Sequence, residues 1–364
     1  MSDIITVKTS STDEYPIFVG SDIFRNLLGH LSEQYYSSKA FVIVDAAIAE
    51  LHGNWLKEAL QSVFDDVVIY EVPQGESSKS IEQWAHIVDF VLNEGVERST
   101  PLIAIGGGVV GDLAGFVAAS VLRGIPLFHV PTTLLAMVDS SIGGKTGINH
   151  ATGKNLIGSF YQPKAVYTDV AFLKTLPQKE WVNGLSEIIK YGMIESPELL
   201  TELAHLTQLP DFGQAEDWIP VITKSAQIKT DVVSRDVKES GVREFLNFGH
   251  TFAHVIETVG GYTGYSHGEA VYAGMFGAIK ASNILGASVD VANLFSFKPL
   301  YTFSLGDIGL TPEELTKLML RDKKVKDQLI RLVLLKDLGR PYVKPFKDTA
   351  LIEDAWKYIM SVFS

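Results

Sequence analysis

The sequence predicts an α/β protein, in which an N-terminal doubly wound, mostly parallel sheet domain precedes an all-helical domain. Apolar β-branched runs alternate with amphipathic segments in the first half, and strand signals become scarce after Leu176-Pro177. Such alternation requires crossover connections and therefore a parallel sheet covered on both faces. The length of 364 residues also exceeds the roughly 250–300 residues of a single core. We therefore place the two domains at 1–178 and 179–364.

The elements of the first domain follow from their apolar patterns. A strand pair at 3–8 and 16–19 comes first. Parallel strands are then expected at 41–44, 66–71, 102–105 and 127–130, with helices at 50–64 and 81–94. The stretch 103–122 is nearly all apolar and long enough to span a bilayer, but Asp112 and its clustered glycines favour a buried strand, a tight turn and a buried helix.

The second half consists of amphipathic segments that predict helices. We place these helices at 180–192, 197–207, 214–234, 244–260, 267–285, 312–321 and 351–362. A late β-branched run at 330–335 fits one strand of a small excursion.

Composition excludes several classes of protein. The formal net charge of -12 repels polyanions, so nucleic acid is not expected as a partner. The chain has no cysteine, which excludes disulfides and thiolate metal sites and fits a reducing compartment. No basic region precedes an apolar core at the N-terminus, so we expect a cytoplasmic protein without a secretory signal or a membrane span.

Histidines four residues apart suggest a metal site. If 246–254 is helical, His250 and His254 project from one face, and His267 lies in a second histidine-bearing stretch. A catalytic metal typically takes three protein ligands, so these imidazoles and the carboxylate of Glu187 are the candidates. Thr251 replaces the glutamate of a zincin motif, which argues against a peptidase. The alternative is that the histidines are hydrogen-bonded core residues.

Two loops after predicted strands suggest a nucleotide site. The segment 106–112 matches G-x-G-x-x-G between a strand and a helix, where backbone N–H groups bind anions. The acidic residue expected about 20 positions later is missing. Asp45, at the end of an earlier predicted strand, could bind the ribose in its place, which would make this a variant of the Rossmann-like site. Residues 73–79 form a second polar loop that could contact ribose or phosphate. The alternative for 106–112 is a glycine turn that only allows close packing of strand and helix. The alternative for 73–79 is an ordinary connecting loop.

The segments 131–149 and 153–158 are dense in hydroxyls, glycines and lysines. Buried polar groups need partners, so this composition suits a phosphorylated, hydroxyl-rich substrate better than a core. Gly144-Lys145-Thr146 resembles part of a Walker motif, but the spaced glycines of that loop are absent, which argues against an ATPase.

These motifs resemble the 3-dehydroquinate synthase family of sugar-phosphate cyclases. The resemblance runs from about residue 70 to 340 and is carried by 106–116, 131–149, 153–163, 187–190, 243–254 and 322–324. It implies an NAD-binding sheet domain and a helical domain that binds a divalent metal, zinc or else cobalt. The metal ligands would be Glu187, His250 and His267, which leaves His254 as a proton-transfer residue together with Glu239.

The resemblance also assigns the remaining site residues. Further catalytic residues would be Lys145, Lys190, Arg243 and Asn247. Substrate contacts would be Arg123, Asp139, Lys154, Asn155, Lys229 and one of Lys323 and Lys324, with Lys324 preferred. NAD contacts would be Asp45, Glu76, Lys79, Gly108, Val109, Val110, Gly111, Asp112, Thr132, Thr133, Lys145, Lys154, Phe172, Leu173, Lys174 and Thr175.

The family's chemistry defines what the chain is expected to do. Its substrate, 3-deoxy-D-arabino-heptulosonate 7-phosphate, undergoes oxidation by NAD, loss of phosphate, reduction by the same NADH and aldol closure. Arg123 corresponds to an arginine that reaches the neighbouring subunit's substrate, which implies a homodimer. Two departures concern 236–239, which keeps only the second of two glutamates, and 45–47, which lacks polar side chains after Asp45. The alternatives are another sugar-phosphate cyclase, a metal- and NAD-dependent polyol dehydrogenase, or a non-catalytic nucleotide-binding module.

Overall fold

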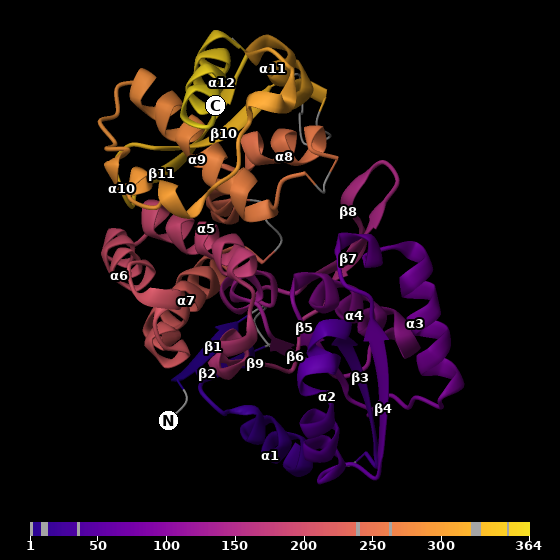
Figure 1. The fold of residues 1–364 in the computed structure, drawn as a ribbon. Helices are drawn as coiled ribbons and strands as arrows, with labels where there is room; N and C mark the ends of the chain where they lie inside the picture. The colour runs from indigo at the N-terminus through magenta and orange to yellow at the C-terminus, as the bar shows by residue number, and fades with distance from the viewer. Residues whose placement is uncertain are drawn as a thin grey trace. The chain divides into compact units, whose positions relative to one another are not determined.

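A computed structural model describes residues 3–8, 14–34, 37–237, 241–261, 264–321, 329–347 and 349–364 (Figure 1). The chain forms two compact units. Unit 1 comprises 1–177 and 214–237, and unit 2 comprises 178–213 and 238–364. A single boundary near residue 178 would have given 214–237 to the second domain. The structure instead returns this segment to unit 1, because helix α7 (Ile219–Arg235), in which Ile222 and Val233 are buried, packs against the first two strands of the chain.

Unit 1 is built on a seven-stranded sheet whose order is β1-β2-β9-β6-β5-β3-β4. The strands are β1 (Asp3–Lys8), β2 (Glu14–Gly20), β3 (Lys39–Asp45), β4 (Asp66–Val72), β5 (Leu102–Gly106), β6 (Leu127–Pro131) and β9 (Ala165–Asp169). Only the edge pair β1–β2 is antiparallel, and the other pairings are parallel. The predicted mostly parallel sheet is therefore confirmed.

Helices flank the sheet of unit 1 (Figure 1). They are α1 (Phe24–Gln34), α2 (Ala46–Gln61), α3 (Ile81–Asn93) and α4 (Gly108–Ser120). Phe41 of β3 and Leu102 of β5 share one buried cluster with Ile87 of α3 and Leu113 of α4. Because side chains alternate along a strand, the intervening residues of β3 and β5 face the other side of the sheet, and they are buried as well. Burial on both faces explains why these strands are continuous apolar runs.

The sequence did not predict a second sheet in unit 1, the antiparallel hairpin of β7 (Lys145–His150) and β8 (Gly153–Phe160). Gly147 and Gly158 face one another across this hairpin. A Cβ atom at Gly147 would lie 2.5 Å from the carbonyl oxygen of Ile157, so the two strands can approach only without side chains here. The glycines that obscured the strand pattern are therefore required by it. Helix α1 and strand β9 were also missed.

Unit 2 is helical, with one exception. Its helices are α5 (Gln178–Ile194), α6 (Pro197–Thr207), α8 (His250–Val259), α9 (His267–Ile284), α10 (Ala292–Phe295), α11 (Pro312–Arg321) and α12 (Ala350–Val362). The exception is the antiparallel pair β10 (Ile330–Leu335) and β11 (Pro341–Phe346), a small excursion from the helical domain of which the sequence indicated the first strand. Strand β10 covers the run at 330–335 and packs against α9.

The predicted helix at 244–260 is interrupted. Gly249 has a φ of 79°, a left-handed conformation that favours glycine, and α8 begins only at His250. A 3₁₀ turn over Val242–Asn247 replaces the first part of the expected helix. His250 and His254 nevertheless lie on one helix, four residues apart, as the spacing predicted.

Helix α9 lies at the centre of unit 2, and most of its side chains are buried. Two glycines allow this. A Cβ atom at Gly268 would lie within 3 Å of the backbone of Asn183 in α5, and one at Gly274 would collide with the backbone of Gly249, the residue before α8. These close approaches bring α5, α8 and α9 together, and these three helices carry the candidate metal ligands.

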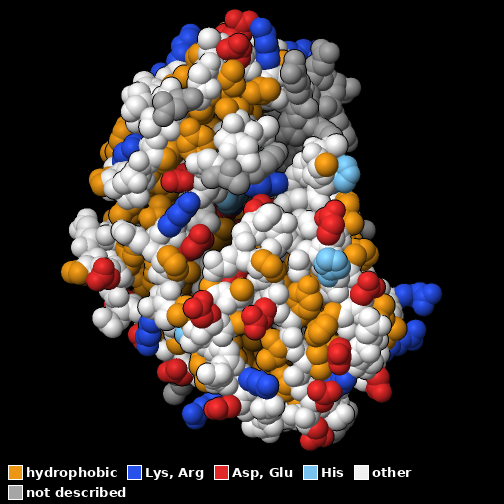
Figure 2. Space-filling view, turned by 45° about the vertical axis from the view of Figure 1, so that its right-hand side comes forward, with side chains coloured by type: hydrophobic (Ala, Val, Ile, Leu, Met, Phe, Trp, Pro, Cys, Tyr) orange, Lys and Arg blue, Asp and Glu red, His pale blue; other side chains and the backbone are white. Residues whose placement is uncertain are grey.

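No helix in the part of the chain that the structure describes is long and apolar enough to cross a bilayer. The apolar stretch 103–122 forms β5, a glycine turn and α4, as predicted. Figure 2 shows acidic and basic side chains interspersed over one face of the molecule.

Candidate active site

The glycine-rich turn joins β5 to α4 at the carboxyl edge of the sheet in unit 1. Gly107 caps α4 in an extended conformation, so the backbone N–H groups from Gly108 to Val110 are available to an anion, whereas that of Gly111 already donates to the carbonyl of Gly107 at 3.0 Å. A Cβ atom at Gly106 would lie 2.8 Å from Cβ of Val110, and one at Gly108 would lie 3.0 Å from Oγ of Ser140. Close packing therefore also requires glycine here. Both interpretations of the motif apply to the same turn.

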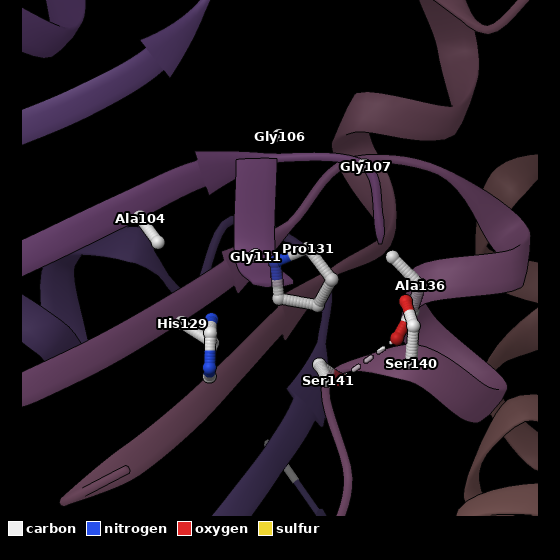
Figure 3. Close-up of a pocket in the computed structure, with 9 residues that line it drawn as sticks. All are labelled: Ala104, Gly106, Gly107, Gly111, His129, Pro131, Ala136, Ser140 and Ser141. Atoms are coloured by element: carbon white, nitrogen blue, oxygen red, sulfur yellow. Dashed lines mark hydrogen bonds between the residues drawn. The ribbon is translucent and has the colours of Figure 1, made fainter. Parts of the chain in front are cut away.

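A small cavity of about 10 Å³ lies under this turn (Figure 3). It is lined by Ala104, Gly106, Gly107, Gly111, His129, Pro131, Ala136, Ser140 and Ser141. Desolvation lowers the pKa of His129 to about 4, so its imidazole is neutral near pH 7. The hydroxyl of Ser141 donates to the carbonyl of Ala136 at 2.7 Å. A volume of this size suits about one water molecule, so the cavity has no room for a dinucleotide.

Two buried lysines form ion pairs near the turn. Lys79 Nζ lies 2.5 Å from Oδ2 of Asp112 on α4. Desolvation raises the pKa of Asp112, and the ammonium of Lys79 opposes that rise. Lys229 Nζ, on α7, lies 2.8 Å from Oδ1 of Asp139. Asp139 belongs to a π-helical turn over Ala136–Ser140, a geometry often found at functional sites. Four residues predicted to contact NAD or substrate are thus arranged in pairs.

The loop 73–79 is fixed to the β7–β8 hairpin. The backbone N–H of Asn149 donates to the carbonyl of Lys79 at 2.8 Å, and its side-chain amide donates to Oε1 of Glu76 at 2.7 Å. The N–H of Asn155 in turn donates to the side chain of Asn149 at 2.9 Å. Asn149 was not among the predicted site residues, although it ends the motif at 131–149. It joins the predicted cofactor and substrate segments of unit 1.

The remaining predicted cations of unit 1 are more accessible. Lys145 opens β7 and is exposed, and Lys154 of β8 is half-buried. Arg123 is exposed after α4, and its φ of 67° follows a φ of 50° at Leu122. Two successive non-glycine residues in the left-handed region are unfavourable, and such strain often marks a functional position.

Other predicted NAD contacts have clear structural roles. Asp45 caps α2 by accepting the N–H of Ala47 at 2.9 Å. Thr133 Oγ1 accepts the N–H of Ala136 at 3.2 Å, and the N–H of the buried Thr132 donates to the carbonyl of Gly106 at 3.0 Å. These residues shape the edge of the sheet on which the cofactor is expected.

The segment 172–175 is held mainly by protein contacts. Phe172 is buried and stacks on Trp55, with ring centroids 6.2 Å apart, and Leu173 is buried beside it. Lys174 pairs with Glu216 at 2.8 Å, and Thr175 Oγ1 lies 3.0 Å from Nε2 of His52. Because these side chains already contact other protein groups, we expect the backbone of this segment, more than its side chains, to border a cofactor site.

Unit 2 brings together the predicted metal ligands Glu187, His250 and His267. One possible ligand atom from each lies within 4.8 Å of the others. Oε1 of Glu187 lies 3.5 Å from Nε2 of His250 and 3.5 Å from Nε2 of His267. Donor atoms on a tetrahedral zinc ion, with bonds of about 2.0–2.1 Å, would be about 3.4 Å apart. The two separations from Glu187 therefore match a zinc-sized divalent ion, and the third donor pair lies within 4.8 Å.

The second nitrogen of each imidazole has its own partner. Nδ1 of His250 lies 3.2 Å from the carbonyl oxygen of Phe248, and Nδ1 of His267 lies 3.4 Å from Oε1 of Glu257. Because a carbonyl or carboxylate accepts the Nδ1 proton, a ring that binds a metal beside Glu187 would do so as the Nδ1–H tautomer, with its lone pair on Nε2. This tautomer is the one that a metal at this position needs.

The electrostatics of the cluster favour a cation. Desolvation, followed by the nearby Lys190, lowers the pKa of His250 to about 3, so this ring is a neutral donor. Desolvation alone would lower the pKa of His267, but hydrogen bonds with Glu187 and Glu257 outweigh it and raise that pKa to about 10. The position between these groups therefore stabilises a positive charge, which is what a divalent ion would supply.

Other predicted residues of unit 2 lie around this cluster. Lys190, almost fully buried, pairs with Oε2 of Glu187 from the next turn of α5. The rings of His250 and His254 are 6.1 Å apart at a steep angle, so His254 lies beside the trio without joining it. Arg243 is buried in the 3₁₀ turn that also holds Asn247.

Glu239, Lys323 and Lys324 lie outside the described residues. Sequence reasoning missed Glu257, which the structure places against His267. The available signal was its position two helical turns after His250, on the same face of α8. It was overlooked because a single glutamate in an amphipathic helix is ordinarily a solvated residue.

Comparisons with known proteins agree with this arrangement. Family models described as 3-dehydroquinate synthase N-terminal and C-terminal match residues 69–183 and 184–325. A 3-dehydroquinate synthase of Dehalococcoides mccartyi is 41% identical over 91% of this chain and 92% of its own length. Another, of Microcystis aeruginosa, is 41% identical over 90% of both chains.

A solved structure also shares the fold. It is 2-epi-5-epi-valiolone synthase from Streptomyces hygroscopicus subsp. jinggangensis 5008, with NAD+ and Zn2+ bound, which superposes with a TM-score of 0.84 at 26% identity. The match covers 98% of this chain and 99% of the other.

Proposed function

Because this chain belongs to the 3-dehydroquinate synthase family, we propose that it converts 3-deoxy-D-arabino-heptulosonate 7-phosphate to 3-dehydroquinate and phosphate. It would thus be a carbon–oxygen lyase of the shikimate pathway, which leads to aromatic amino acids. The observation that carries this proposal is the Glu187, His250 and His267 cluster, whose spacing fits a divalent ion. We further propose zinc as the metal, with cobalt as an alternative, and a cytoplasmic location.

The metal would lower the pKa of a coordinated hydroxyl, and NAD would accept and return hydride. Residues of unit 2 would position the metal ligand, bind the substrate and transfer protons. Lys190, which pairs with Glu187, would hold that carboxylate in position and present a buried cation to the substrate. His254 would move protons, since an imidazole can serve as acid or base near neutrality.

The substrate carries a carboxylate and a phosphate, which an acidic protein must hold with local cations. Arg243 is proposed for the carboxylate, because a guanidinium can bind both oxygens at once. Its burial strengthens such an interaction by excluding water. Asn247 would add an amide contact from the same turn. Glu239 and one of Lys323 and Lys324 are retained as proposed site residues.

In unit 1 some of the charged residues are proposed to bind the cofactor and others the substrate. The first turn of α4 and the pair of Lys79 and Asp112 are proposed for NAD. Lys229 and Asp139, with Lys145, Lys154 and Asn155 of the hairpin, are proposed for the substrate. Lys79 and Lys229 are buried and each is held against a carboxylate, so an incoming anion would meet ammonium groups whose positions are already fixed.

A second candidate is a metal- and NAD-dependent polyol dehydrogenase, which needs the same metal cluster. The lysines and Arg243 favour the cyclase, because a polyol carries no phosphate or carboxylate for them to bind. Purified protein given NAD, zinc and the heptulosonate phosphate should release inorganic phosphate. If the protein releases no phosphate from this substrate in the presence of zinc and NAD, the proposal is contradicted.

We also propose that the protein acts as a homodimer in which Arg123 completes the partner's site. An exposed arginine on a strained backbone gains little in stability from that position, whereas an anion from a neighbouring site would explain it. Inactive Arg123→Ala subunits mixed with inactive Lys145→Ala subunits should then regain up to roughly a quarter of the activity, because random exchange makes about half of the dimers mixed and each mixed dimer has one intact site.

Subunit exchange in that mixture can be followed by mass. Exchange without any recovered activity would contradict the shared site. Mixing two batches of Arg123→Ala subunits provides the control, since such dimers have no intact site.

A further inference from the structure

Glu257 is a buried carboxylate that none of the proposed roles uses. It lies on α8, is 5% exposed, and its Oε1 atom is 3.4 Å from Nδ1 of His267. A buried carboxylate is costly unless charged or hydrogen-bonding partners compensate for the lost water. Its position against a predicted metal ligand suggests what that cost serves.

We propose that Glu257 is a positioning residue for the metal: it holds His267 in the tautomer and ring orientation that direct Nε2 toward Glu187. This inference rests on the proposed metal site and goes beyond its three ligands. A neutral imidazole has one N–H group and one lone pair. With the Nδ1 proton donated to Glu257, the lone pair is fixed on Nε2, which faces Oε1 of Glu187 at 3.5 Å.

The two histidines differ in how far the surrounding protein restrains their rings. The side chain of His250 is 13% exposed and uses the backbone carbonyl of Phe248. The side chain of His267 is 32% exposed and stands at the first position of α9, where fewer neighbours restrict its rotation. The more accessible ligand is the one with a carboxylate behind it. A charged acceptor forms the stronger hydrogen bond, so it can restrain a ring that packing does not.

Charge balance supports the same role. Lys190 pairs with Oε2 of Glu187 and offsets the negative charge of this ligand. Imidazoles that bind a metal through Nε2 are neutral and add none, so the trio alone would present little net charge to a divalent ion. Glu257 adds a negative charge one imidazole away from the ion and makes His267 a more basic ligand.

The test is the metal affinity of Glu257→Gln, measured by competition of Zn²⁺ with a chromophoric chelator. The amide keeps the size of the side chain but loses its charge, and loss of such a partner typically weakens metal binding roughly 10–100-fold. Substitution of Co²⁺ gives an independent readout, because altered ligand geometry changes its visible absorption. Glu313→Gln provides a matched control, since Glu313 is an exposed carboxylate on α11 of the same unit and pairs with Lys317.

Wild-type affinity in a folded Glu257→Gln variant, with an unchanged Co²⁺ spectrum, would overturn this inference and leave the proposed function standing. A wild-type chain that binds neither ion would instead overturn the metal site itself. If circular dichroism shows that the Gln variant does not fold, Glu257→Asp is used with the same criterion, because the shorter carboxylate keeps the charge and moves it away from Nδ1.

Discussion

His250→Ala should leave the protein almost without bound metal and lower its turnover roughly 1000-fold or more, since a Lewis-acid metal typically contributes several kcal/mol to catalysis. His250 is a neutral donor whose Nε2 atom lies 3.5 Å from Glu187, and its removal leaves only Glu187 and His267 of the trio to hold the ion. Metal content after dialysis, measured by mass spectrometry, and phosphate release from the substrate would test this result together.

His254→Ala is the control for that result. It removes the neighbouring imidazole, 6.1 Å from His250 between ring centroids, without touching the trio. This variant should keep its metal and lose turnover, because His254 is proposed to move protons. Full metal occupancy in His250→Ala would exclude the proposed ligand set, and loss of metal in His254→Ala would restore the pairing of the two histidines on α8.

Gly274→Ala should destabilise unit 2 by about 3 kcal/mol, near the upper end of typical overpacking costs. A Cβ atom there would overlap the backbone of Gly249 and come within 3.2 Å of the N atom of Ala253. Backbone cannot rotate away as a side chain can, so α8 must move from α9. Because His250 lies on α8 and His267 on α9, metal affinity should fall as well.

Gly29→Ala provides the control for this prediction. Gly29 lies within α1 of unit 1, and a Cβ atom there would meet nothing within 4 Å. Alanine in a helix is normally favoured over glycine by about 0.5–1 kcal/mol, so this variant should be as stable as the wild type or more stable. Denaturant unfolding and zinc titration of both variants give the comparison. Unchanged stability and zinc affinity in Gly274→Ala would show that the helix contact does not hold the ligands together.

The parallel sheet could be predicted because its strands are buried on both faces and are therefore continuous apolar runs. The β7–β8 hairpin could not, because Gly147 and Gly158 must lack side chains where the strands meet, and this removes the alternating pattern. The grouping of 214–237 with unit 1 was also hidden, since an amphipathic helix does not reveal which partner covers its apolar face.

The candidate site could also be predicted only in part from the sequence. Histidine spacing indicated a metal, and the structure places His250 and His267 beside Glu187, while their role as ligands stays a prediction. Spacing alone could not choose between His254 and His267, because that choice depends on how α8 meets α9. Spacing puts Glu257 on the same face of α8 as His250, but its relevance comes from a 3.4 Å contact with His267 on another helix.

The most direct test of the proposed reaction is its stoichiometry with only a trace of NAD. In the cyclase the hydride returns to the same substrate, so NAD acts as a catalyst, whereas a dehydrogenase must release NADH in every turnover. With the heptulosonate phosphate and zinc we expect many equivalents of inorganic phosphate per NAD, a matching amount of cyclic product and no net rise in NADH absorbance. NADH that accumulates in step with substrate consumption, while phosphate stays on the product, would contradict the cyclase and favour the polyol dehydrogenase.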